Sequence, residues 1–268
     1  MNQTLSEIAQ ILLMSLGPLV LFAVVIHWLE RFTQRRLAER FGWKSVLWTG
    51  WLGTPVHELS HALMCHAFGH RVDEIVLFEP DPESGRLGYV RHSYKQKNWF
   101  EEMGNFFIGI APLVGGCIAM VILLWLFYPT AVHAAIQSVN SDPDATMWSG
   151  TMSAVTGLLD EVVTLEHVAT IRFWVFLYLI LCVGSHMAPS ASDYRGGLRG
   201  GLVLGVIVLA VVAVLAVAVP DAASLAAGVV EIFSPLLAVL LLAVALCAVA
   251  AAVVFLLTAA FPRRFEVG

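Results

Sequence analysis

Residues 54–63 read Thr54-Pro55-Val56-His57-Glu58-Leu59-Ser60-His61-Ala62-Leu63, which contains the pattern His-Glu-x-x-His. On an α-helix, residues four apart share a face, so His57 and His61 can present two imidazoles to one metal ion while Glu58 projects beside them. In this arrangement the glutamate serves as base toward a zinc-activated water. The stretch therefore predicts a metal site on a helix.

The composition places that helix in a lipid bilayer. Of 268 residues, 59% are hydrophobic and only 13% are charged, and the mean hydropathy is +0.80, outside the range of soluble globular domains. A net charge of −5 without basic clusters among aromatic residues argues against nucleic acid as a partner. The four cysteines lie in apolar runs with no CxxC pair, so neither disulfides nor a cysteine zinc site is expected.

Apolar segments indicate an all-α polytopic membrane protein with about six transmembrane helices. A bilayer core of ~30 Å needs about 20 helical residues, and suitable segments are residues 8–29, 45–70, 105–127, 167–187, 201–219 and 232–261. Between the second and third lies a polar region, residues 71–102, in which two β-rich runs flank a Pro/Gly/Asp turn. It predicts a small β-hairpin after the motif helix, and a surface loop is the alternative. The compact size suggests a bacterial inner membrane.

Three parts follow from these segments. Residues 1–44 form an N-terminal anchor helix with a basic amphipathic segment at the interface, residues 45–200 form the core that carries the motif, and residues 201–268 form a C-terminal helix pair. Six spans with the C-terminus inside agree with the positive-inside rule for every loop except residues 31–44, which are basic and would lie outside. Either this segment breaks the rule or one of the first two segments is re-entrant.

A catalytic zinc needs a third protein ligand and an open fourth position. Asp193 is favoured because it follows the fourth span in a Pro/Ser/Gly break, from which the chain can turn back toward the motif. His66 is disfavoured because it lies about 140° around the helix from His61. The full set of candidates is Asp193, His186, His66, His70, Glu79 and His92. Glu58 at membrane depth costs at least ~2.5 kcal/mol, so it also needs a compensating partner.

These residues resemble a known family, the site-2 protease-like intramembrane zinc metalloproteases. The motif His57-Glu58-Leu59-Ser60-His61 resembles the family's first metal motif, and residues 189–196 resemble its later motif, in which an aspartate preceding a glycine is the third ligand. The resemblance covers residues 51–197. The family usually reads Leu-Asp-Gly at the later motif, whereas this chain reads Asp193-Tyr194-Arg195-Gly196.

The resemblance implies that His57, His61 and Asp193 bind Zn²⁺ and that Glu58 is the general base in peptide hydrolysis. It also implies that the substrate is a transmembrane helix of another protein, locally unwound at the cleaved bond. The sequence does not predict the oligomeric state.

Two further residues are candidates for contact with substrate. Ser185 stands where the family pattern has a substrate-orienting asparagine, and His186 beside it is a candidate for stabilising the oxyanion. For His186 the alternative is a helix-end histidine at the membrane interface.

A different class of function stays open: a non-proteolytic metal-binding membrane protein, either a transporter or an inactive protease relative that binds transmembrane partners. Glu58 favours the enzyme, because a transport site needs no base beside two histidines. The last two spans also lack acidic residues and histidines, so they offer no second site along a transport pathway.

Overall fold

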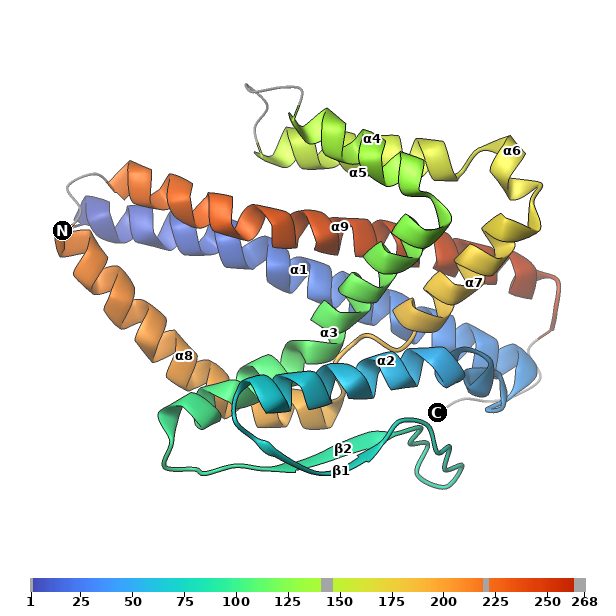
Figure 1. Cartoon of the computed structure of the whole chain (residues 1–268), viewed down its shortest axis with the longest axis horizontal. Helices are drawn as coiled ribbons and strands as arrows, with labels where there is room; N and C mark the ends of the chain where they lie inside the picture. The colour runs from blue at the N-terminus through green and yellow to red at the C-terminus, as the bar shows by residue number, and fades with distance from the viewer. Residues whose placement is uncertain (1, 141–146, 219–221, 263–268) are drawn as a thin grey trace.

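The structure, a computed structural model, describes residues 2–140, 147–218 and 222–262. The described residues form helices and one two-stranded sheet, joined by turns and loops (Figure 1). The elements are α1 (Asn2–Phe41), α2 (Ser45–Ala67), β1 (Arg71–Val76), β2 (Tyr89–Ser93), α3 (Trp99–Phe127), α4 (Pro129–Asn140), α5 (Met147–Val162), α6 (Leu165–Val168), α7 (Ile171–Gly184), α8 (Ala191–Ala218) and α9 (Ala222–Ala259). The mostly helical fold with one small sheet agrees with the prediction.

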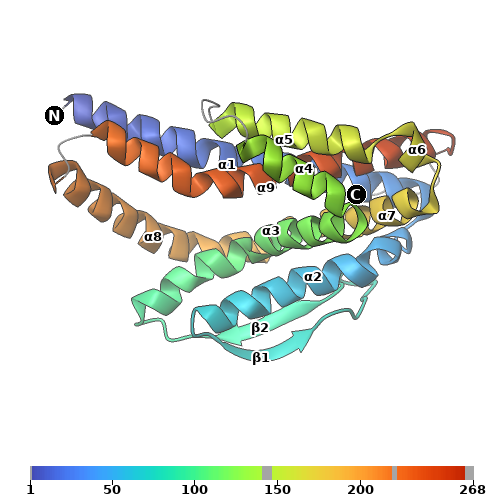
Figure 2. The same cartoon turned by 45° about the horizontal axis from the view of Figure 1, so that its top comes forward.

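The N-terminal part is one continuous helix, in which the predicted anchor and the basic segment follow one another without a break. No strong helix breaker occurs between residues 29 and 41, and α1 continues to Phe41, after which Gly42 adopts a left-handed φ of 79°. α1 lies along α9 (Figures 1 and 2). Ring centroids of Phe32 and Phe255 are 6.5 Å apart and those of Phe41 and Phe261 are 5.5 Å apart, so the two helices run parallel.

The motif helix α2 lies between the hairpin on one side and α3 with α7 on the other (Figure 2). Small residues allow this close packing. A Cβ on Gly115 would collide with the hydroxyl of Ser60, and a Cβ on Gly116 would lie 2.6 Å from the Cβ of Met187. The crossing of α2 and α7 is equally tight, because a Cβ on Gly53 would overlap the carbonyl of Cys182.

The predicted β-hairpin is confirmed, with its strands shifted by several residues. β1 and β2 are antiparallel with Ile75 opposite Val90, and the register shifts between Val72 and Glu74. The Pro/Gly/Asp turn is fixed by Asp81, whose carboxylate accepts hydrogen bonds from the Ser84 hydroxyl at 2.5 Å and the Glu83 N–H at 3.0 Å. These bonds, that of Ser84 first, hold the pKa of Asp81 below its usual value.

Among the described residues, two helical segments are long and apolar enough to cross a membrane: Trp99–Phe127 and Leu236–Ala259. A third apolar helix, Ile171–Gly184, is shorter than the span predicted there. Between α3 and α7 the chain forms α4, α5 and α6, as far as the structure describes it. Six crossings therefore stay a prediction.

The apolar core lies where α1, α3, α7 and α9 meet. Its most completely buried side chains include Ile26, Met120, Phe176 and Ile180. Many large apolar side chains on the same helices are exposed instead, among them Trp28, Ile118, Ile122, Trp125, Leu256 and Leu257. An exposed apolar surface of this kind is expected of helices that face lipid.

Candidate metal centre

Three of the predicted site residues lie together: His57, His61 and Asp193 each offer one ligand atom, and these atoms lie within 4.8 Å of one another. The two Nε2 atoms are 3.2 Å apart. Oδ2 of Asp193 lies 3.7 Å from Nε2 of His57, and Oδ1 lies 3.3 Å from Nε2 of His61. The helix spacing of the two histidines and the return of the chain at α8 thus produce a compact group of donors.

Backbone carbonyls orient both imidazoles. Nδ1 of His57 lies 2.6 Å from the carbonyl oxygen of His186, and Nδ1 of His61 lies 2.8 Å from that of Ile108. A carbonyl only accepts hydrogen bonds, so each Nδ1 carries a proton, and in the neutral imidazole each Nε2 presents its lone pair. Two such lone pairs and a carboxylate facing one another form an arrangement that a metal cation between them would stabilise. Metal-binding histidines are oriented in the same way.

Asp193 is placed by the start of α8. The residue was expected in a loop but lies in the first turn of that helix. Its Oδ2 accepts a hydrogen bond from the Ser190 N–H at 2.7 Å, and its own N–H donates to the Ser190 hydroxyl at 3.3 Å. This reciprocal pair is a capping box, which the pattern Ser-x-x-Asp favours. The close approach of α3 depends on Gly109, where a Cβ would lie 2.7 Å from the Asp193 carbonyl oxygen.

Glu58 is buried next to these donors, with 7% of its surface exposed. It interacts electrostatically with His57, His61 and Asp193. The position of Glu58 on α2 thus leaves its carboxyl group near enough to both histidines to interact with their charges. An acid buried here is compensated if a cation lies among the donors.

His186 and Ser185 are held at the end of α7. Nδ1 of His186 lies 3.2 Å from the Cys182 carbonyl, and its Nε2 lies 3.4 Å from Nε2 of Gln34. The Ser185 hydroxyl donates to the Leu181 carbonyl at 2.6 Å. The described contact of His186 with the centre is therefore made by its backbone carbonyl. The predicted role of these side chains toward substrate stays a prediction.

Helix α1 also positions the centre, which sequence reasoning did not indicate. Gln34 donates to the Ser185 carbonyl at 2.7 Å, and Glu30 accepts from the Ala188 N–H at 2.7 Å. Both bonds hold residues 185–190, the segment between the His186 carbonyl and Asp193. A charged residue near the end of a predicted span was the only sequence signal for such a contact.

The other candidates for the third ligand lie elsewhere. His66 and Glu79 are exposed. His70 and His92 come together with Cys65 in a separate group. Burial, and after it the neighbouring His70, holds the pKa of His92 below its ordinary value.

The donor set at His57, His61 and Asp193 fits a divalent metal. Two imidazole nitrogens and one carboxylate oxygen make up the ligand set of catalytic zinc sites, which keep a fourth position open, and other divalent transition metals accept the same ligands. The described residues therefore include a group able to hold a metal ion beside a buried carboxylic acid. Comparisons of the chain with protein-family models, with curated proteins and with solved structures find no match.

Proposed function

We propose that this protein is an intramembrane zinc metalloprotease that hydrolyses peptide bonds in or near transmembrane segments of other membrane proteins. The observation that carries the proposal is the pair of Nε2 lone pairs of His57 and His61, 3.2 Å apart and facing Asp193, with buried Glu58 alongside. A purely structural polar cluster has no need to direct three acceptors at one point. A hydrolytic metal site requires that arrangement together with a base.

Each residue then has a definite role. His57, His61 and Asp193 hold Zn²⁺, and Ile108 and His186 fix the imidazole orientations through their carbonyls. Zn²⁺ bound there supplies Lewis-acid chemistry and acidifies water. Glu58 takes a proton from the attacking water and delivers it to the leaving amine.

The surroundings support a substrate that approaches through lipid. Two long apolar helices and the exposed apolar side chains on α1, α3, α8 and α9 favour a multi-pass protein, which we place in a bacterial inner membrane. The hairpin lies along α2 (Figure 1). The described sheet has two strands, so each strand pairs with the other along one edge only. An extended substrate segment can form hydrogen bonds with the other edge of a strand.

A non-proteolytic metal-binding membrane protein, a transporter in particular, is the second candidate. The observation in its favour is the group Cys65, His70 and His92, which places a second set of metal-binding side chains further along α2. Glu58 argues against it, since its carboxylate is buried beside the first donors and a transport site does not need a base there.

Cleavage of single-span reporter proteins, reconstituted with the purified protein in liposomes, tests the proposal. We expect the wild type to cleave, and Glu58→Gln to lose about 10²- to 10⁴-fold in rate because the general base is removed. Zinc content measured on the same samples should be unchanged in Glu58→Gln and should fall in His57→Ala by the one ion held at His57, His61 and Asp193.

Equal cleavage by the wild type and Glu58→Gln, or a zinc content in His57→Ala equal to that of the wild type, would contradict the proposal. Metal flux into the liposomes that is unaffected by Glu58→Gln would instead support the transporter.

A further inference from the structure

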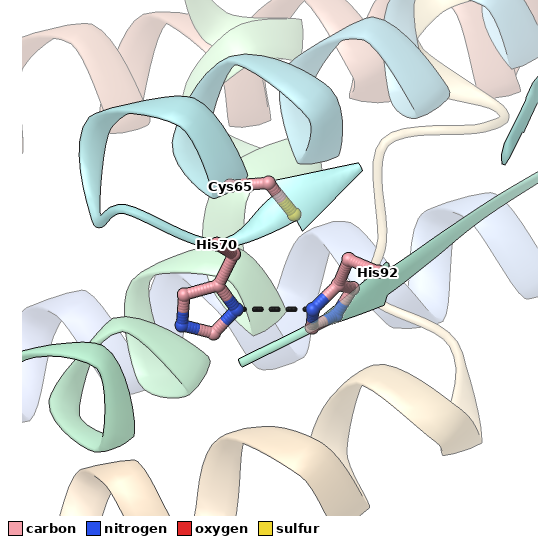
Figure 3. Close-up of side chains that lie close together, drawn as sticks. All are labelled: Cys65, His70 and His92. Atoms are coloured by element: carbon pink, nitrogen blue, oxygen red, sulfur yellow. Dashed lines mark hydrogen bonds between the residues drawn. The ribbon is translucent and has the colours of Figure 1, made fainter. Parts of the chain in front are cut away.

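A second group of metal-binding side chains lies where α2 meets the hairpin. Cys65 is on the last turns of α2, His70 directly precedes β1, and His92 is on β2. Their ligand atoms lie within 4.8 Å of one another, and the Nδ1 atoms of the two histidines are 3.0 Å apart. Figure 3 shows the sulfur of Cys65 directed toward the gap between these two nitrogens.

His70 is oriented as a metal-binding histidine would be. Its Nε2 lies 2.7 Å from the carbonyl oxygen of Glu101, so Nε2 carries the proton and Nδ1 presents its lone pair to the group. That carbonyl is held in place at the start of α3. The carboxylate of Glu101 accepts hydrogen bonds from the Lys95 N–H at 2.6 Å and the Asn98 amide at 2.8 Å.

The group is enclosed on one side and accessible on the other. Cys65 is fully buried and His70 is 4% exposed, whereas His92 is half-buried on the hairpin. α3 closes the inner side, because Gly104 brings its backbone so near that a Cβ would lie 3.0 Å from Nε2 of His70. An ion can therefore enter from the side of His92 and be shielded from bulk water once bound.

We propose that Cys65, His70 and His92 form a second metal site, separate from the site at His57, His61 and Asp193, for a thiophilic divalent cation of the zinc type. One thiolate and two imidazoles are ligands that such ions prefer. In a tetrahedral zinc site two nitrogens lie about 3.3 Å apart, as follows from Zn–N bonds of about 2.0 Å. The 3.0 Å separation of the two Nδ1 atoms is close to that value. On binding, the thiol of Cys65 releases its proton to solvent, and water occupies the fourth position.

The site would fasten the hairpin to the motif helix. Cys65 lies one helical turn beyond His61 on the same face of α2, so an ion bound to Cys65 and His92 joins β2 to the helix that carries the first site. The second metal site shares no ligand with the first site, and its existence does not depend on protease activity.

Cobalt substitution tests the site, because only a thiolate ligand gives Co²⁺ an intense charge-transfer absorption in the near ultraviolet. The full chain, purified in detergent and freed of metal, is titrated with Co²⁺. We expect this absorption in the wild type, its loss in Cys65→Ser and in His92→Gln, and its retention in His57→Ala. Cys117→Ser is the matched control, since Cys117 is also buried but belongs to neither group of ligands, and it should keep the absorption.

Zinc content gives a second measurement. We expect two Zn²⁺ per chain in the wild type, one in Cys65→Ser and one in His57→Ala. An absorption absent from the wild type, or kept in both Cys65→Ser and His92→Gln, would overturn the proposal. His92 is half-buried on a strand, so we expect His92→Gln to fold. Its cobalt absorption therefore tests the site even if Cys65→Ser does not fold. Loss of peptide cleavage alone, with the cobalt absorption intact, would affect only the first site.

Discussion

At the scale of single residues, Asp193 has two tasks that can be separated. It caps α8 through Ser190, and it directs a negative charge at the two histidines. In Asp193→Asn the side-chain oxygen can still accept the bond from the Ser190 N–H, but the charge is lost. We expect zinc affinity to fall by more than the about 10- to 100-fold that loss of an outer-shell partner costs.

Zinc titration against a competing chelator measures this change, and far-UV circular dichroism should show unchanged helix content. Ser190→Ala is the matched control: it removes the hydroxyl of the capping box, leaves the carboxylate, and should cost about 1 kcal/mol of helix stability. Zinc affinity that is equal in Asp193→Asn and the wild type would exclude Asp193 as a ligand.

The sequence predicted the side chains of the first site but not what orients them. His57 and His61 follow from helical spacing, and Asp193 from its position after a span. The carbonyls of Ile108 and His186 leave no signal, because every residue has a carbonyl group. Cys65, His70 and His92 were also not predicted as a group, because they become neighbours only when the hairpin folds back on α2.

At the scale of elements, the crossing of α3 and α8 determines where Asp193 lies. Gly109 on α3 meets the backbone of Asp193 and Gly197 on α8, with a Cβ-to-oxygen distance of 2.7 Å if a side chain were added. We expect Gly109→Leu to separate the helices, to destabilise the fold by about 1–3 kcal/mol through overpacking, and to abolish zinc binding at the first site.

Gly205→Leu is the control for that substitution. Gly205 lies on α8, the other helix of this crossing, but a Cβ there meets no atom within 4 Å. Thermal unfolding and zinc content should therefore match the wild type in Gly205→Leu and decrease in Gly109→Leu. Normal zinc content in Gly109→Leu would show that this crossing does not position Asp193.

The elements themselves were predictable to different degrees. Two β-rich runs around a turn predicted the hairpin, although its strands begin and end several residues away from those runs. The predicted first span ends at residue 29, where charged residues begin, but a helix tolerates charged residues and α1 ends only at Phe41, before Gly42. Composition predicts where a helix meets a polar environment better than it predicts where the helix ends.

At the scale of the whole molecule, the parallel pair of α1 and α9 bears on membrane topology. If both helices cross the membrane, the end of α1 and the end of α9 lie on the same side. The total number of crossings, counted from α1 to α9, is then odd. The basic residues 31–44 then lie on the same side as the end of α9. If that side is the cytoplasm, residues 31–44 obey the positive-inside rule, which they do not obey with six crossings and the C-terminus inside.

Single introduced cysteines distinguish the two arrangements. Lys44 and Pro262 are exposed, and the four native cysteines are buried, so a membrane-impermeant maleimide should react mainly with an added thiol. With α1 and α9 parallel, we expect Lys44→Cys and Pro262→Cys to be labelled from the cytoplasmic face, after permeabilisation, and Asn2→Cys from the opposite face in intact cells. With an even number of crossings, Lys44 and Pro262 instead lie on opposite sides. The reason is that the chain changes side at each crossing, and an odd number of crossings then separates the two positions. Labelling of these two positions from opposite faces would therefore contradict the parallel pair, and with it the proposal that residues 31–44 lie inside.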